Sequence, residues 1–266
     1  MSLSLIHVMY MSDRLLQGGI VARCVIGDSS LCLINCHLAA GQKAVRRRNA
    51  DVAGMLEDRA VFSPSDHQLA YVGGGDGSMV LDHEFVLVSP RLHLIAFDSF
   101  SWRSLQFNGD MNYRIDHRRD AIISAIRTGD LSSLLAHDQL IREMKFNRGF
   151  RLRGFSEGPL SFAPTYKYDP RSNEYDTSEK RRSPAWCDRI LSRSHVSSRI
   201  RQLHYRRYEA NVSDHRPISA AFALTVKSVQ PESREKQKAV VEAAWIKEQM
   251  RLLVAAKEFY VRQALM

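Results

Sequence analysis

Four short segments of the sequence carry residue types that could hydrolyse a phosphate ester. They contain Asn35 and His37, Asp110 and Asn112, Asp188, and Asp214 followed by His215. A carboxylate such as Asp110 could orient and deprotonate a water molecule, and a histidine held by a carboxylate could assist proton transfer. Side chains such as His37 and Asn112 could hydrogen-bond the non-bridging oxygens where charge gathers. These residue types predict attack of water on a phosphate ester.

Each segment taken alone also has a simpler structural explanation. A single histidine on a strand is more often structural, and an Asp-x-Asn pair beside glycine is usually a turn. Asp214 and His215 could cap the start of a strand, and the segment around Asp188 could be a buried strand with one ion pair. The specific signal is the combination of the four segments in this order.

Composition and charge limit the partners. The 266 residues carry a net charge of +9, and 29 of the 38 basic residues are arginine. Arginine binds phosphate through a bidentate fork, so the excess favours a polyanionic partner such as nucleic acid, a phosphorylated small molecule or an anionic membrane surface. A solvated basic surface explains the same numbers equally well.

No stretch of the sequence is apolar enough to span a membrane, and no signal peptide is evident. The four cysteines form no C-x-x-C pair and are too few for a disulfide scaffold, so we expect a reducing intracellular compartment.

Strands and helices alternate along the chain, which predicts a layered α/β fold. The patterns indicate strands at 19–26, 31–38, 186–192 and 214–226, and helices at 42–58, 117–127 and 131–146. A long helix is expected at 232–265, which separates a domain of residues 1–226 from an extension of residues 227–266. We favour packing of this helix on the domain over a role as a partner helix.

Five strings identify the family that the sequence resembles. They are NCHLAAGQ (35–42), NGDMNYRI (108–115), FAPTYKYD (162–169), PAWCDRIL (184–191) and SDHRP (213–217). Together they resemble the signature of the inositol polyphosphate 5-phosphatases, within the DNase I-like endonuclease/exonuclease/phosphatase superfamily. The resemblance spans residues 18–226 and implies a four-layer α/β sandwich. It also implies Mg²⁺-dependent removal of the 5-phosphate from phosphoinositides or soluble inositol phosphates.

The resemblance assigns a role to each matching position. Asp110 resembles the water-activating base, Asn112 its neighbour at the phosphate, and His37 the histidine at the scissile phosphate. His215 resembles the catalytic histidine, with Asp188 as its orienting carboxylate, and Asp214 resembles an acidic residue beside the metal. The substrate-binding positions are Asn35, Arg114, Tyr166, Lys167 and Arg189. Of these, Tyr166, Lys167 and Arg189 resemble the group that grips a neighbouring ring phosphate.

Two features depart from the family pattern. The family takes its main Mg²⁺ ligand from a glutamate well upstream of the Asn-x-His segment, whereas the first glutamate here is Glu57. We therefore expect an N-terminally incomplete domain that binds Mg²⁺ weakly. In addition, residues 88–106 interrupt an otherwise continuous match, DHEFVL followed by FNGDMNYRI. Val-Ser and Gln at the segment's ends can be encoded by GTGAGT and CAG, so we expect either a translated retained intron or a true insertion.

The expected protein is a cytoplasmic phosphatase that acts peripherally at membranes, where Lys180, Arg181 and Arg182 could face the lipid surface. A phosphoinositide-binding module without catalysis is the first alternative, favoured by the missing glutamate. A nuclease of the same superfamily is the second, and its basic charge would suit DNA. The YKYD and CDRIL strings favour inositol phosphate over nucleic acid.

Overall fold

The computed structural model describes residues 5–14, 17–57, 62, 71–89, 93–94, 105–107 and 110–264. The chain divides into two compact units, Met1–Val226 and Lys227–Met266. No helix in the described ranges is both long and apolar enough to cross a membrane.

Two β-sheets form the frame of the first unit. The six-stranded sheet has the order β1-β2-β3-β4-β8-β7, and the four-stranded sheet has the order β5-β6-β10-β9. Among the strand pairs that the structure describes, only β3–β4 is parallel. The strands are β1 (Leu5–Arg14), β2 (Gln17–Ile26), β3 (Ser29–His37), β4 (Phe85–Ser89), β5 (His93–Leu94), β6 (Leu105–Phe107), β7 (Ser156–Glu157), β8 (Leu191–Ser194), β9 (Ile200–Arg207) and β10 (Ile218–Leu224).

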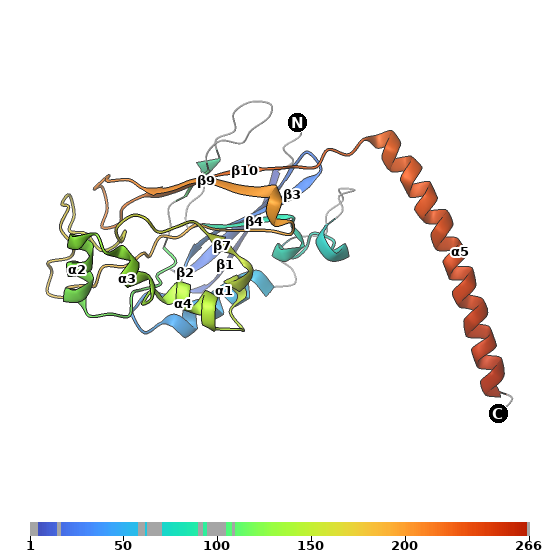
Figure 1. The fold of residues 1–266 in the computed structure, drawn as a ribbon, viewed down its shortest axis with the longest axis horizontal. Coiled ribbons are helices and arrows are strands. Elements are labelled where there is room, and N and C mark those ends of the chain that lie inside the picture. Colours follow the sequence, from blue (N-terminus) through green and yellow to red (C-terminus); the bar gives the residue numbers. More distant parts are fainter. Residues whose placement is uncertain are drawn as a thin grey trace. The chain divides into compact units, whose positions relative to one another are not determined.

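Helices cover one face of the six-stranded sheet, and the four-stranded sheet covers the other (Figure 1). The helices of this unit are α1 (Val45–Glu57), α2 (Arg119–Thr128), α3 (Leu131–Leu135) and α4 (Gln139–Phe146). The expected α/β sandwich is confirmed.

The apolar run of β3 explains why this strand is central. Cys32 and Ile34 pack toward α1 and α4, whereas Leu31 and Leu33 pack between the two sheets. Alternate side chains of a strand point to opposite faces, so a continuous apolar run indicates burial on both. The last residue of β3, His37, emerges from this rigid position at the sheet's edge.

Buried Arg48 on α1 fixes the segment that follows β3. Its guanidinium donates hydrogen bonds to the carbonyls of Ala39 and Gly41 at 2.9 and 2.8 Å, and to Gln139 Oε1 at 2.7 Å. The predicted helix at 42–58 thus holds the loop beside the site in place.

The predicted helix at 131–146 is two helices, because Asp138 interrupts it. Asp138 caps α4 by accepting a hydrogen bond from the Ile141 amide, and its carboxylate turns inward to meet Arg189. Strands β1 and β9 were not predicted. In β9, the exposed positions Arg201, Leu203 and Arg206 are separated by half-buried residues that are mostly polar, which weakens the apolar signal of a strand.

Arg189 lies in a buried ion-pair network and not at a substrate site, which corrects the role expected from the sequence. Its side chain is 0% exposed and pairs with Asp138 at 2.9 Å and with Glu157 at 2.6 Å. Tyr205 adds a hydrogen bond to Glu157 at 3.0 Å. All three charges are satisfied within the core, so none is available to a ligand.

The described parts of 88–106 are short strand segments. β4 extends through Val88 and Ser89, and β5 and β6 lie at one edge of the four-stranded sheet. Residues 90–92 and 95–104 fall outside the described residues. Asp110 nevertheless stays beside His215, as both explanations of the segment require.

The second unit consists of α5 (Pro231–Ala264), as predicted. Its large apolar side chains are exposed, among them Val240, Trp245, Leu253 and Phe259. The expected packing of this helix on the domain stays a prediction.

We predict that Arg189→Ala lowers the free energy of unfolding by about 3–5 kcal/mol, because it leaves two buried carboxylates without a partner. Urea unfolding followed by circular dichroism measures this change. Arg142→Ala, an exposed arginine of α4, is the matched control and should stay within about 0.5 kcal/mol of the parent. Equal stabilities of the two variants would contradict the buried network.

Candidate active site

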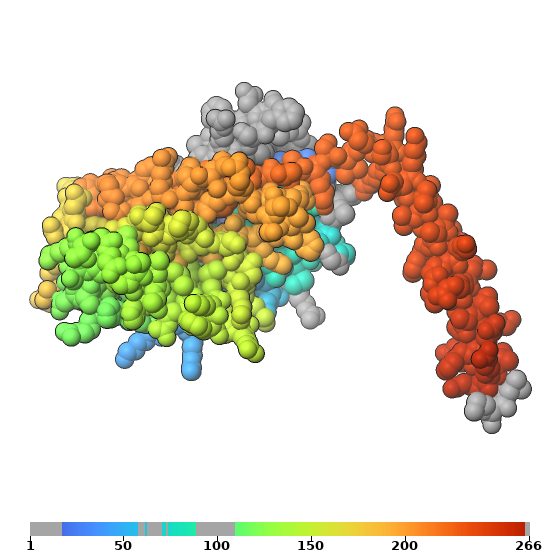
Figure 2. Space-filling view, viewed as in Figure 1, coloured from blue at the N-terminus to red at the C-terminus, as the bar shows by residue number. Residues whose placement is uncertain are grey.

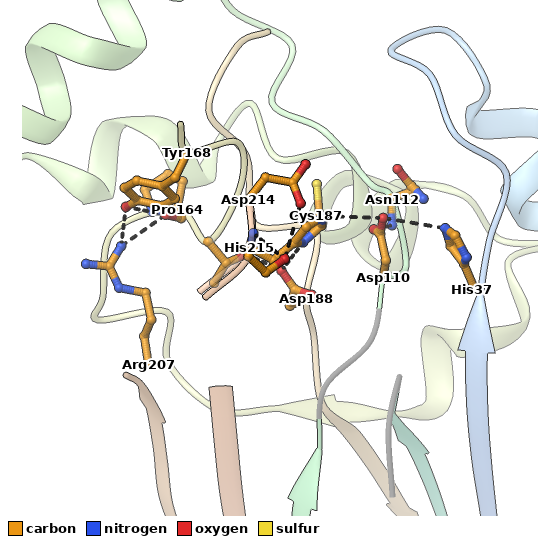
Figure 3. A network of polar contacts seen from close by, with 12 residues as sticks. His37, Asp110, Asn112, Pro164, Tyr168, Cys187, Asp188, Arg207, Asp214 and His215 are labelled. Atoms are coloured by element: carbon orange, nitrogen blue, oxygen red, sulfur yellow. Dashed lines mark hydrogen bonds and ion pairs between the residues drawn. The ribbon is translucent and has the colours of Figure 1, made fainter. Parts of the chain in front are cut away.

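The four predicted segments converge at one end of the six-stranded sheet (Figure 3). His37 ends β3, and the Asp110 carbonyl accepts a hydrogen bond from the Leu38 amide at 3.0 Å. Asp188 lies three residues before β8, and His215 lies three residues before β10. Residues from distant parts of the chain therefore share one site, as predicted.

His215 is held between two carboxylates. Its Nδ1 lies 2.9 Å from Asp188 Oδ2, and its Nε2 lies 3.9 Å from Asp110 Oδ2. Thr165 Oγ1 donates a second hydrogen bond to the same Asp188 oxygen at 2.6 Å. Asp188 therefore fixes the imidazole so that Nε2 points into the site toward Asp110.

The charges of Asp188 and Asp110 on either side of His215 favour a protonated histidine beside a carboxylate of raised pKa. Burial acts to lower the pKa of His215, but Asp188, followed by Asp110 and Asp214, outweighs it and raises the pKa to about 9. Burial and the nearby Asp188 charge raise the pKa of Asp110, while His215 and Arg114 oppose them. An imidazolium can donate to a phosphoryl oxygen, and a carboxylate of raised pKa is a stronger general base.

His37 faces the opposite side of Asp110. Its Nε2 lies 3.7 Å from Asp110 Oδ2, and its side chain is 57% exposed. Asp110 itself is 19% exposed, so the carboxylate is open to a ligand between two histidines. Asn35 projects from the same face of β3 as His37 and is half-buried there.

Asn112 and Arg114, both predicted at the substrate phosphate, are buried beside Asp110. Asn112 is 1% exposed; its side-chain amide donates to the Leu38 carbonyl, and its backbone amide donates to Asp110 Oδ1 at 2.7 Å. Arg114 hydrogen-bonds both the carbonyl and the side-chain oxygen of Asn112. Asn112 adopts a φ of 57°, a left-handed conformation that asparagine tolerates. The pair therefore positions Asp110.

Lys167 and Tyr166 border the site beside His215. The Tyr166 ring stacks obliquely on the His215 ring with centroids 4.6 Å apart. Lys167 Nζ lies 3.4 Å from Asp214 Oδ2, and both side chains are about one-third exposed. The ammonium is thus the one cation of the predicted phosphate grip that remains open to a ligand.

The described residues do not fit a complete metal site. Asp214 was predicted as a Mg²⁺ ligand, but among the described residues no group of three or more His, Cys, Asp or Glu side chains is arranged to hold a metal. Divalent cations such as Mg²⁺ prefer several oxygen ligands. Asp214 instead faces the Lys167 ammonium.

Thr165 supports the Asp188 carboxylate, although it was not predicted as a site residue. It lies within the FAPTYKYD string, one residue before Tyr166, but a threonine there carries no chemical signal of its own. Its importance comes from the Asp188 contact, which depends on the fold.

We predict that residues 1–266 bind Mg²⁺ with a dissociation constant of roughly 1 mM or weaker, because few oxygen ligands converge. Isothermal titration with MgCl₂ measures the affinity, and Asp214→Asn provides the comparison. A dissociation constant below about 10 μM would contradict the incomplete ligand set.

Comparisons with known proteins agree with this geometry. Residues 8–221 match the family model described as "Endonuclease/Exonuclease/phosphatase family 2". A "Probable inositol polyphosphate 5-phosphatase" of Schizosaccharomyces pombe is 43% identical over 233 residues, which are 86% of this chain and 18% of that protein. Synaptojanin of Caenorhabditis elegans is 37% identical over 209 residues, 78% of this chain and 16% of that protein.

A solved structure has the same fold. The inositol polyphosphate 5-phosphatase domain of SPsynaptojanin, in complex with inositol (1,4)-bisphosphate and a calcium ion, superposes with a TM-score of 0.66 at 29% identity. The match covers 95% of this chain and 62% of that one. The chain spans less than a fifth of the length of the two curated relatives.

Proposed function

The chain belongs to the endonuclease/exonuclease/phosphatase family, among the inositol polyphosphate 5-phosphatases, and we propose that it removes the 5-phosphate from phosphoinositides or inositol polyphosphates. The alignment of Asp188, His215 and Asp110 is the observation that carries this proposal. The similar SPsynaptojanin domain binds inositol (1,4)-bisphosphate, which is what remains when inositol 1,4,5-trisphosphate loses its 5-phosphate.

The proposal gives each side chain of the site a role in the reaction. Asp110 accepts a proton from the attacking water, since its carboxylate is accessible and less acidic than usual. His215, held as an imidazolium by Asp188, donates to a phosphoryl oxygen, and exposed His37 hydrogen-bonds another. Mg²⁺ is the cofactor that we expect for this chemistry, although the described residues form no complete site for it.

A phosphoinositide-binding module with impaired catalysis is the second candidate. The absence of a metal-ligand cluster among the described residues favours it. The intact Asp188–His215–Asp110 line opposes it, because ligand binding alone does not require an oriented imidazole. Nuclease activity remains an outcome that the experiment must distinguish.

We predict that Asp110→Asn lowers the rate of phosphate release about 10²- to 10⁴-fold, the usual contribution of a general base. Release of inorganic phosphate from inositol 1,4,5-trisphosphate in MgCl₂ measures the rate, with plasmid nicking assayed in parallel. An unchanged melting temperature serves as the folding control.

Each outcome of this experiment selects one candidate. Phosphate release that depends on Asp110 supports the phosphatase. Substrate binding without release identifies the binding module, and nicking without release identifies a nuclease. Phosphate release that survives in Asp110→Asn would remove this carboxylate from the mechanism.

We propose that Lys167 binds a phosphate next to the scissile one. A charge-assisted hydrogen bond contributes about 1.5–3 kcal/mol, so Lys167→Ala should lower kcat/KM roughly 10- to 150-fold on a substrate with a 4-phosphate. The loss should be much smaller on a substrate that has the 5-phosphate but lacks the 4-phosphate. Equal losses on both substrates would show that Lys167 does not read the neighbouring phosphate.

Membrane attachment through a basic surface is a further part of the proposal. Arg119, Arg127 and Arg181 line an open cleft of about 630 Å³, together with apolar Ile123 and Ile126 of α2. Figure 2 shows the surface of α2 next to the loop that carries Arg181. Lys180 and Arg182 are exposed beside it. Three guanidiniums around one carboxylate, Glu174, favour an anionic lipid surface.

The double variant Lys180→Ala/Arg181→Ala should bind phosphatidylserine vesicles roughly 30-fold more weakly, since each basic residue contributes about 1 kcal/mol near the surface. Cosedimentation with vesicles that contain or lack phosphatidylserine measures binding. Arg142→Ala/Arg148→Ala removes the same charge from an exposed region elsewhere. Equal weakening by both double variants would exclude a specific membrane-facing surface.

A further inference from the structure

The residue-number offset between paired residues of β3 and its parallel neighbour changes abruptly after β4. Leu33 pairs with Leu87, Ile34 with Val88 and Asn35 with Ser89, so the residue numbers of partners differ by 54. Continued at this offset, the partner of His37 would be Arg91.

Asp110 occupies that partner's position instead. The Leu38 amide donates to the Asp110 carbonyl at 3.0 Å, a bond that belongs to a His37–Asp110 pair in a parallel ladder. The offset has therefore risen from 54 to 73, a difference of 19 residues. Residues 88–106 number 19.

Removal of these residues would leave one uninterrupted strand. Phe107 would then pair with Ile34, Asn108 with Asn35, Gly109 with Cys36 and Asp110 with His37. An excision of any other length would put Asp110 out of register, and a slip of one residue would turn its side chain to the other face.

The residues that would follow Leu87 after the deletion are similar in type to those that follow it now. Val88 is buried between Ile34 and Leu191, its partners in β3 and β8, and apolar Phe107 would take its position. Polar Asn108 would take the position of polar Ser89. The apolar and polar pattern of the strand is therefore preserved across the junction.

We propose that Phe85–Leu87 and 107–110 form one strand in the chain that lacks residues 88–106, although Phe107 here ends β6 and pairs with Ile218. Residues 88–106 are then an insertion dispensable for folding and for the placement of Asp110. The shortness of β6 fits this view, because it pairs with only Ile218–Ala220 of the seven-residue strand β10. A translated retained intron accounts for such an insertion.

Three deletions test the proposal without any assay of catalysis. Deletion of 88–106 preserves the register, whereas deletion of 88–105 or of 88–107 shifts it by one residue. The first variant should unfold cooperatively at a Tm no lower than that of the full chain, with the Leu38 and Met111 amides protected from hydrogen exchange. The two shifted variants should melt at least about 5 °C lower and lose that protection.

The proposal is overturned if the three deletions behave alike, or if deletion of 88–106 destabilises the chain. Mature transcripts provide an independent test of the intron origin, because messages lacking the corresponding 57 nucleotides are expected. Transcripts that all contain these nucleotides would overturn that origin. Neither result depends on whether the protein is a phosphatase.

Discussion

The hydrogen bond between the Asp188 carboxylate and His215 Nδ1 is the interaction on which the site depends. It orients the imidazole, directs Nε2 toward Asp110 and makes the protonated form the stable one. Thr165 fixes the carboxylate from the other side. Without this contact, the site would hold two accessible histidines and a carboxylate with no defined relation among them.

The same segment also anchors the fold. Successive side chains of an extended chain point in opposite directions, so Asp188 faces the site while Arg189 enters the core. There Arg189 joins α4 and β7 through Asp138 and Glu157, and the Cys187 carbonyl accepts the Met111 amide at 2.8 Å. Cys187 and Arg189, the neighbours of Asp188 in the chain, thus fix the position of Asp188 relative to Asp110.

The sequence predicted the α/β sandwich, the main elements and the meeting of His37, Asp110, Asp188 and His215. Those predictions succeeded because apolar periodicity is local and because the five strings are specific. The burial of Asn112, Arg114 and Arg189, which were all predicted at the substrate, was not foreseen for one physical reason. Polar side chains near a site can turn either toward a ligand or into the core, and only tertiary packing decides between these directions.

Other features could not be predicted because they depend on long-range partners. The break between α3 and α4 at Asp138 depends on the ion pair of its carboxylate with the buried Arg189 guanidinium. Thr165 has a role only because it contacts Asp188. Strand β9 was not predicted because its sequence is largely polar and basic, and it is stabilised by pairing with β10. The resemblance supplied roles for residues, whereas the structure separated those that contact the site from those that support it.

The titration of His215 by NMR tests the central claim most directly, because the claim is that Asp188 holds a charged imidazole at the site. The predicted pKa is about 9, well above the ordinary value for histidine, and it should fall in Asp188→Asn. Since the folded pKa is raised, the stability that the charged pair contributes is present below about pH 6.5 and is lost as the pH rises through 9. A His215 pKa at or below about 6.5 in the parent chain, unaffected by Asp188→Asn, would contradict the account.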